Sequence, residues 1–476
     1  MESKTVLDYF REITRIPRES GHEEQIIAYL QRFAEEHSLE SRTDEAGNVV
    51  IVRPASPGCE NLPVTVLQSH SDMVCEKNSG VEHDFSRDPI EYVIEDGWMI
   101  ARDTTLGADC GIGMAAQLAV LTSDLQTGRI ECLFTVSEET GLYGAKALKP
   151  GFITGKILIN LDSEDEGELF VGCAGGMDTT AVFRYAGVPV PEGSKLARIK
   201  VSGGIGGHSG DDIDKGRANA VQLLARFLYS HPELHLCSIE GGNKSNAIAR
   251  EAVAVAAVAD TEVEPLKAAV RAFGSDLKAE YALADPDIRA EVSLEEVPAG
   301  MQAVEPGVAR AVVTALFAAP HGVLAMSRDI PGLVETSTNL ASVKMPEEGV
   351  IAVGTSQRSS VDTERRAAGL KVEAAFRLAG AEVTHESEYP GWKPNMDSAL
   401  LKVCEESYRR LFGTAPVVRA IHAGLECGLF LDTFPGLDMI SFGPTLRGVH
   451  APGERLDLAS LDRFVALLED VILHIR

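Results

Sequence analysis

Apolar and polar positions alternate in two ways along the N-terminal part of the chain, and each pattern predicts one kind of element. Short apolar runs predict buried strands at residues 49–52, 63–67, 129–136 and 156–161. Apolar residues at helical spacing predict helices at residues 7–13, 23–36 and 113–123. This mixture of strands and helices is typical of an α/β domain with a mixed, largely parallel sheet flanked by helices.

The middle of the chain has a different order of elements. One α+β group is predicted from strands and helices at residues 196–201, 219–228, 252–259, 264–281 and 288–294. A similar alternation follows at residues 308–318, 340–345, 350–357, 364–378 and 382–388. The chain then returns to the first pattern, with a helix at 397–411 and a core strand at 437–441. We therefore predict one domain from residues 1–186 and 391–476, interrupted by an inserted α+β domain of two similar halves at residues 187–390.

Length and charge narrow the range of functions. A chain of 476 residues is too long for one compact core, which agrees with two or more domains. The net charge of −27 argues against nucleic acid or an anionic membrane as a partner. The eight cysteines are isolated, and no apolar stretch reaches the length of about 18 residues that a membrane helix needs. We expect a cytoplasmic protein with free thiols.

Residues of the types that bind metals follow several of these apolar runs. Ligands of α/β sheets bind beyond the carboxyl ends of the strands, which is where His70, Glu138-Glu139 and Asp162 stand. Asp109 lies in a glycine-rich turn, and His450 comes after the core strand at 437–441. The predicted metal ligands are therefore His70, Asp109, Glu139, Asp162 and His450.

Each of these residues has an ordinary interpretation when it is taken alone. A histidine at a strand end is more often a hydrogen-bonded residue than a ligand, and an aspartate among glycines is more often a turn residue. Together they indicate two divalent cations, whose four positive charges would be balanced by three carboxylates and one hydroxide. Oxygen and imidazole ligands suit Zn²⁺, Mn²⁺ or Co²⁺, and we favour Zn²⁺.

Two further carboxylates have predicted roles beside these ligands. His70 and Asp72 are two residues apart on a strand and point the same way, so Asp72 is expected to hold the imidazole of His70 in one orientation. Glu138 is adjacent to a ligand in sequence but points differently. Two cations clamp a bridging water and lower its pKa, and Glu138 is the candidate general base for that water.

The segments that carry these residues resemble motifs of the aminoacyl-histidine dipeptidases, which are cytosolic, carnosinase-like dinuclear metallopeptidases of Xaa-His type. The four resembling segments around the predicted ligands are residues 70–78, 104–109, 137–141 and 160–166. Further similar segments are residues 206–210, 357–362, 420–428 and 448–450. The resemblance runs in order from about residue 5 to the end of the chain.

This resemblance implies a catalytic domain in two segments and an inserted lid domain. It implies that His70, Asp109 and Asp162 bind one metal ion and that Asp109, Glu139 and His450 bind the other, with a cis peptide bond after Asp109. On the lid, His208 would stabilise the oxyanion of the reaction. Asn246 and Arg358 would receive the carboxylate or backbone of a dipeptide substrate.

The chain also departs from the pattern of this family. Cys110 stands where asparagine is usual after the bridging aspartate, Asp103 where glycine is common, and Ala249 and Ala451 where proline and serine are expected. No predicted ligand or base is lost, so we expect a metal-dependent dipeptidase. A related dinuclear hydrolase (an aminoacylase, a tripeptidase or a glutamate carboxypeptidase) and a non-catalytic metal-binding scaffold are the alternatives. The preferred dipeptide, the native metal and the formation of a homodimer stay open.

Overall fold

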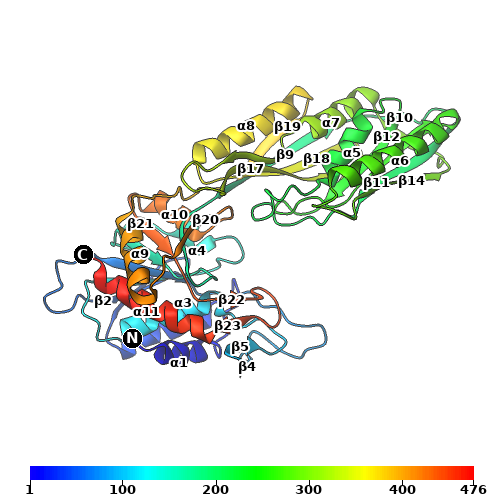
Figure 1. Ribbon diagram of the computed structural model, residues 1–476. Helices are drawn as coiled ribbons and strands as arrows, with labels where there is room; N and C mark the ends of the chain where they lie inside the picture. Colours follow the sequence, from blue (N-terminus) through cyan, green and yellow to red (C-terminus); the bar gives the residue numbers. More distant parts are fainter. The chain divides into compact units, whose positions relative to one another are not determined.

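The computed structural model describes residues 1–476, which form two compact units. The first unit contains residues 1–172, 392–420 and 425–476, and the second contains residues 173–391 and 421–424. Figure 1 shows the helices and strands with their labels. No helix combines the length and the apolar character that crossing a membrane requires.

The first unit is built on an eight-stranded mixed sheet. Its strands follow the order β1 (Glu40–Thr43), β2 (Val49–Arg53), β6 (Ile130–Thr135), β3 (Thr65–His70), β7 (Ile157–Asn160), β21 (Asp438–Ser441), β8 (Glu168–Cys173) and β20 (Val417–Ile421). The neighbours β6, β3, β7 and β21 are parallel, whereas β1, β2 and β8 pair antiparallel. This confirms the predicted fold class of the domain.

Helices and a small second sheet complete the first unit. The helices are α1 (Ser3–Ile13), α2 (Glu24–Glu36), α3 (Ala108–Leu121), α4 (Tyr143–Ala147), α9 (Ala399–Phe412), α10 (Glu426–Thr433) and α11 (Leu458–His474). The small sheet has the order β22 (Leu446–Arg447), β23 (Arg455–Asp457), β5 (Trp98–Ala101) and β4 (Tyr92–Glu95). Helix α3 packs against β3 and is buried along nearly its whole length, which explains its almost uninterrupted apolar sequence.

The second unit has a long antiparallel sheet with helices on one face (Figure 1). The strands follow the order β14 (Arg289–Glu295), β11 (Ser194–Ser202), β13 (Ala252–Ala259), β12 (His235–Gly242), β17 (Val334–Lys344), β18 (Val350–Ser359), β9 (Gly175–Arg184) and β19 (Glu382–Tyr389), with β16 (Gly322–Met326) beside β17. The strands β10 (Gly187–Pro189) and β15 (Gln302–Val304) form a separate pair. The helices are α5 (Ala220–Tyr229), α6 (Val263–Glu280), α7 (Pro306–Ala318) and α8 (Asp362–Leu378), with a 3₁₀ turn η1 (Asp260–Glu262) before α6.

The strand order shows that this unit consists of two halves with the same topology. If the strands of each half are numbered along the chain, β14-β11-β13-β12 and β19-β9-β18-β17 both have the order 4-1-3-2. A helix follows the third strand in each half, α6 after β13 and α8 after β18. The halves meet where β12 pairs with β17 over Gly241 and Gly242.

Strand β9 lies outside the predicted range of the inserted domain, because that range begins at residue 187. Its sequence starts with two glycines and contains Asp178 and two threonines, so the apolar pattern of a buried strand is weak. The strand nevertheless pairs with β18 along all ten of its residues and with β19 on its other side. It is the first strand of one half, and the other half is inserted between β9 and β17 in the chain.

Candidate metal centre

Three of the five predicted metal ligands are brought together by the parallel strands of the first unit. His70 is the last residue of β3, Glu139 follows β6, and Asp162 follows β7. Strand β3 lies between β6 and β7 and is parallel to both. The carboxyl ends of these three strands therefore meet at one edge of the sheet, with His70 in the middle.

The other two predicted ligands reach this edge from turns. Asp109 lies at the start of α3, where its backbone is not yet helical, and the peptide bond between Asp109 and Cys110 is cis, as the resemblance implied. His450 lies in the turn between β22 and β23 with a positive φ of 62°. Both side chains reach the strand ends, because Asp109 Oδ1 lies 3.1 Å from His70 Nε2 and His450 Nε2 lies 2.9 Å from Glu139 Oε1.

The five side chains form two groups that share Asp109. In the first group, His70 Nε2 lies 3.1 Å from Asp109 Oδ1 and 3.2 Å from Asp162 Oδ1. In the second group, His450 Nε2 lies 3.1 Å from Asp109 Oδ2 and 2.9 Å from Glu139 Oε1. Each oxygen of the Asp109 carboxylate thus faces a different histidine.

This geometry fits a pair of metal ions. Two ligand atoms bound at the tetrahedral angle to one Zn²⁺ ion, at the usual bond lengths, lie about 3.3–3.6 Å apart. The distances within both groups, 2.9–3.2 Å, are slightly shorter than this range, so a small outward movement of the side chains would admit an ion to each group. In addition, the buried Oδ1 of Asp162 lies 3.2 Å from His70 Nε2 without the geometry of a hydrogen bond, so its lone pairs can bind a cation.

The pKa values of His450 and Glu138 also indicate a site that binds cations. Hydrogen bonds to Asp109 and Glu139 raise the pKa of His450 to about 11, even though its burial works against the charged form. Burial raises the pKa of Glu138 well above its usual range, and the carboxylates of Asp162 and Glu426 raise it further, against the opposing effect of His70. The cluster therefore has an excess of negative charge that favours the binding of cations.

Asp72 connects His70 to the segment that carries Glu138 and Glu139. Its Oδ1 lies 3.3 Å from His70 Nδ1 and accepts a hydrogen bond from the backbone N–H of Glu138 at 3.1 Å. Its Oδ2 accepts hydrogen bonds from the backbone N–H of Glu139 at 3.2 Å and from Ser20 Oγ at 2.7 Å. Burial opposes the ionisation of Asp72, but the hydrogen bonds from His70 and Ser20 lower its pKa to about 2. A buried carboxylate thus fixes both ligand segments.

A second buried carboxylate lies behind the strand ends and was not identified from the sequence. Glu426, in the first turn of α10, accepts hydrogen bonds from Gln68 Nε2 at 2.6 Å and from Thr135 Oγ1 at 2.9 Å. Gln68 in turn accepts one from Asn160 Nδ2 at 2.6 Å. These residues link the ends of β3, β6 and β7. The signals in the sequence were the resemblance of residues 420–428 to a family motif and the polar Gln68 directly after the apolar Val66 and Leu67.

Cys110 lies beside the first group of ligands. It is buried, and its thiol donates a hydrogen bond to the backbone oxygen of Leu161 at 3.3 Å. Its sulfur lies within 4.8 Å of ligand atoms of His70 and Asp162. Burial and the nearby charge of Asp162 raise the pKa of this thiol well above its usual range, which favours the neutral thiol over a thiolate ligand.

The three predicted substrate-binding residues lie in the second unit, where Ser209 connects them. The backbone N–H of Ser209 donates to the backbone oxygen of Asn246 at 2.9 Å, next to a bridge between His208 and Ala247. Arg358 Nε donates to Ser209 Oγ at 3.3 Å, and its Nη1 donates to Tyr389 Oη at 3.2 Å. The structure therefore places His208, Asn246 and Arg358 close together in this unit.

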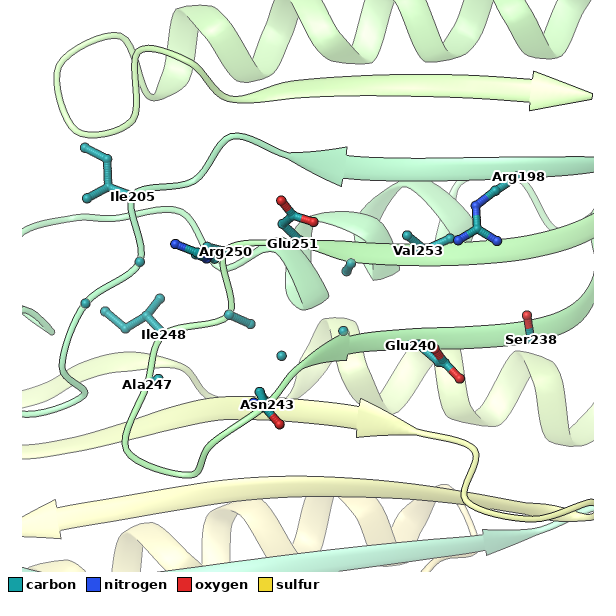
Figure 2. Close-up of a pocket in the computed structure, with 16 residues that line it drawn as sticks. Arg198, Ile205, Ser238, Glu240, Asn243, Ala247, Ile248, Arg250, Glu251 and Val253 are labelled. Carbon is teal, nitrogen blue, oxygen red and sulfur yellow. The ribbon is translucent and has the colours of Figure 1, made fainter. Parts of the chain in front are cut away.

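A separate cavity of about 840 Å³ lies on the second unit, beside the loops that carry His208 and Asn246 (Figure 2). Arg198 and Glu240 line it, and they alternate with Ile199 and Ile239, which pack in the core beneath the helices. The cavity thus opens on the face of the sheet that the helices leave uncovered. The side chains of His208, Asn246 and Arg358 do not line it.

Comparisons with known proteins agree with this site. Residues 66–474 match the family described as Peptidase family M20/M25/M40. The cytosol non-specific dipeptidase of Escherichia coli K12 is 40% identical over 472 residues, which cover 98% of this chain and 97% of that protein. Aminoacylhistidine dipeptidase from Vibrio alginolyticus has a similar structure, with a TM-score of 0.92, 38% identity, and coverage of 99% of this chain and 96% of that one.

A more distant structure shares the fold. Aminopeptidase PepT from Bacillus cereus has a TM-score of 0.63 and 17% identity, and the match covers 100% of this chain and 99% of that one. The resemblance to aminoacyl-histidine dipeptidases that the motifs suggested is confirmed by the similar proteins. The chain belongs to peptidase family M20/M25/M40.

Proposed function

We propose that this protein is a metal-dependent dipeptidase that hydrolyses a range of dipeptides, those of Xaa-His type included. The observation that carries the proposal is the pair of ligand groups that share the carboxylate of Asp109, with Glu138 beside them. The names of the two relatives with 40% and 38% identity support the same activity, since both are dipeptidases. The name of the Escherichia coli protein also supports a cytosolic location.

The proposed cofactors are two divalent metal ions, one held by His70, Asp109 and Asp162 and the other by Asp109, Glu139 and His450. The donor set, two imidazoles and three carboxylates without a thiolate, suits Zn²⁺, Mn²⁺ or Co²⁺, and of these we propose Zn²⁺. Divalent cations in such a pair polarise the scissile carbonyl and lower the pKa of water. They would also remove the excess negative charge that the carboxylates create.

Two carboxylates of the first unit, those of Glu138 and Asp72, have the proposed roles in catalysis. Glu138 takes a proton from the attacking water and passes it to the amine that leaves when the peptide bond breaks. Asp72 holds His70 through Nδ1 and holds the backbone of Glu138 and Glu139, so it orients a ligand and the base together.

We propose that the second unit binds substrate as a lid inserted into the catalytic domain. Because β9 belongs to this unit, the inserted domain extends from the expected residues 187–390 to residues 173–391. Two backbone N–H groups, those of Gly210 and Asp211, donate to His208 Nδ1 at 3.3 Å. This leaves Nε2 as the protonated nitrogen, which can donate to a developing oxyanion. Arg358 offers a guanidinium for a substrate carboxylate, and Asn246 an amide for its backbone.

The proposal is tested by the hydrolysis of a substrate panel. The metal-free protein would be loaded with Zn²⁺, Mn²⁺ or Co²⁺ and given dipeptides with and without C-terminal histidine, tripeptides and N-acyl amino acids. We expect dipeptides to be the best substrates, because both relatives with 40% and 38% identity are named as dipeptidases. Faster hydrolysis of tripeptides or N-acyl amino acids would assign the protein to a different activity on the same fold.

The shared role of Asp109 gives a prediction about metal content. In the Asp109→Ala variant both ligand groups lose a carboxylate, so we expect one bound ion or none in place of two. Elemental analysis after dialysis measures this number for the variant and the wild type. Asp165→Ala is the control, because Asp165 is a nearby acidic residue that forms an ion pair with Arg447. Two ions per chain in the Asp109→Ala variant would contradict the sharing of this carboxylate.

A further inference from the structure

Glu454 forms an unusual set of hydrogen bonds just before Asp109. This glutamate lies between His450 and β23, and it is 2% exposed. Its Oε2 accepts hydrogen bonds from the backbone N–H groups of Leu106 and Gly107, at 2.7 and 2.9 Å. Its Oε1 accepts from those of Ala108 and Asp109, at 2.8 and 3.3 Å. One carboxylate thus binds four consecutive backbone donors.

These four donors belong to the turn that begins α3. The backbone of Asp109 and Cys110 is not helical, so regular helix geometry does not supply partners for these N–H groups. Buried backbone donors need an acceptor. Glu454 supplies that acceptor from near the other end of the chain. Since the last of the four donors is the N–H of Asp109 itself, Glu454 fixes the backbone from which the shared carboxylate extends.

Arg18 holds the other side of the same turn. Its guanidinium is fully buried and donates to the backbone oxygens of Asp72, at 2.6 Å, and of Gly107. Gly107 is therefore held by its oxygen to Arg18 and by its N–H to Glu454. A Cβ at Gly107 would overlap the guanidinium, so the close approach requires glycine. The buried charges of Arg18 and Glu454 have opposite signs, which lowers the cost of burying each of them.

Glu454 also belongs to the turn that carries His450. The backbone N–H of Glu454 donates to the oxygen of Ala451 at 3.1 Å, and that of Ala451 donates to Gly448 at 3.1 Å. The backbone of this turn is tied again to the Asp109 side of the site, because Gly453 N–H donates to the oxygen of Thr104 at 3.0 Å. Glu454 therefore connects two ligand segments that are more than three hundred residues apart in the sequence.

We propose that Glu454 is a positioning residue for the metal centre, and that it sets the placement of Asp109 relative to His450 so that both ions bind tightly. Arg18 supports it by holding Gly107 to the segment that carries His70 and Asp72. The inference rests on the proposed function in assuming that Asp109 and His450 bind metal. It assigns to Glu454 no contact with substrate or metal.

The test compares the metal affinity of Glu454→Gln with that of a matched control. In Glu454→Gln an amide NH₂ replaces one acceptor oxygen and faces backbone N–H groups, so about half of the hydrogen bonds are lost. The control is Glu131→Gln, because Glu131 is also fully buried and accepts hydrogen bonds from the backbone N–H groups of Thr154 and Gly155, at 2.7 and 3.2 Å. It lies near the amino end of β6, at the opposite end of the strand from Glu139.

Zn²⁺ affinity would be measured on the full chain by competition with a chromophoric chelator, and the melting temperature of the metal-free protein would be measured beside it. We expect Glu454→Gln to weaken binding by about 10–100-fold, as is typical for partners of metal ligands, and Glu131→Gln to leave it unchanged. The metal-free melting temperatures should fall in both variants. The Glu454→Asp variant, which keeps the charge on a shorter side chain, should have an intermediate affinity and serves if Glu454→Gln does not fold.

Unchanged Zn²⁺ affinity in both Glu454 variants would overturn the proposal. An equal loss of affinity in Glu131→Gln would also overturn it, since the effect would then follow general stability. Because the readout is metal binding, it is separate from the substrate panel. If the wild-type protein binds Zn²⁺ tightly but hydrolyses no dipeptide, the proposed function is wrong and the role of Glu454 still stands. If the Glu454 variants hydrolyse dipeptides normally and bind Zn²⁺ with unchanged affinity, only the role of Glu454 is wrong.

Discussion

The Glu138→Gln variant is expected to lose turnover by about 10²–10⁴-fold while it keeps its fold and its metal ions, because a general base typically contributes that factor. Glutamine has almost the same shape as glutamate, but its amide does not accept the proton of the attacking water. The backbone N–H of residue 138 would still donate to Asp72, so the ligand segment stays in place.

Steady-state hydrolysis of a dipeptide measures this loss, and elemental analysis shows whether the metal content is preserved. The matched control is Glu45→Gln, since Glu45 is an exposed carboxylate of the same unit that pairs only with Lys149. It should leave turnover unchanged. Turnover near the wild-type value in Glu138→Gln would remove Glu138 from the role of base. A variant that loses its metal as well would show that Glu138 acts in metal binding instead.

The clustering of His70, Glu139 and Asp162 could be predicted from sequence because parallel strands obey a simple geometric rule. The apolar runs that precede His70, Glu139 and Asp162 form the strands β3, β6 and β7. These strands are adjacent and parallel. The sequence shows that each residue stands at a strand end, and the rule places those ends at one edge. The positions of Asp109 and His450 do not follow from such a rule, because both residues lie in turns. Asp109 was predicted from its glycine-rich turn and His450 from its place after the strand at 437–441, and the resemblance to a family then implied which ion each would bind.

The residues that hold the ligands in place were harder to find. Arg18, Glu454 and Glu426 look like ordinary charged residues in sequence. The partners of Arg18 are 53 to 89 positions away, and those of Glu454 and Glu426 are about 300 or more positions away. What distinguishes them is that they are buried, and a buried charge requires partners that only the folded chain shows. Asp72 was identified because its partner, His70, is only two residues away on the same strand.

The fold of the second unit could also be predicted only in part from the sequence. Two α+β halves could be predicted from the alternation of elements, and the structure gives both halves the same strand order. The sequence did not reveal that one half is inserted into the other, because β9 comes before the whole first half and has a polar, glycine-containing sequence. Pairing with β18 and β19 outweighs its weak intrinsic preference for a strand.

Replacement of His208 by alanine is expected to lower turnover by about 10²–10³-fold, the usual cost of removing one donor to an oxyanion. Because Nδ1 of His208 accepts two backbone hydrogen bonds, Nε2 carries the proton and is the donor. This interaction forms as the substrate oxygen becomes negative. The Michaelis constant should therefore change less than turnover, and the metal content should not change at all.

Kinetics with a dipeptide across a range of concentrations separates the two constants. The His235→Ala variant is the control, because His235 is a half-buried histidine of the same unit, on β12. A His208→Gln variant keeps an N–H donor on a side chain of similar reach and should recover part of the lost turnover. If His208→Ala raised the Michaelis constant and left turnover unchanged, His208 would contribute to substrate binding and not to stabilisation of the transition state.

The two halves of the second unit lead to a sharper expectation for the same histidine. His208 follows β11 in one half and Arg358 lies on β18 in the other, and Arg358 donates to Ser209, the residue next to His208, within a single chain. We therefore expect His208 to act on substrate bound to its own chain. Mixing His208→Ala chains with Glu138→Gln chains under conditions of subunit exchange should then restore no activity, because every site lacks either the base or the donor. Marked recovery of turnover would show instead that His208 of one chain completes the site of another.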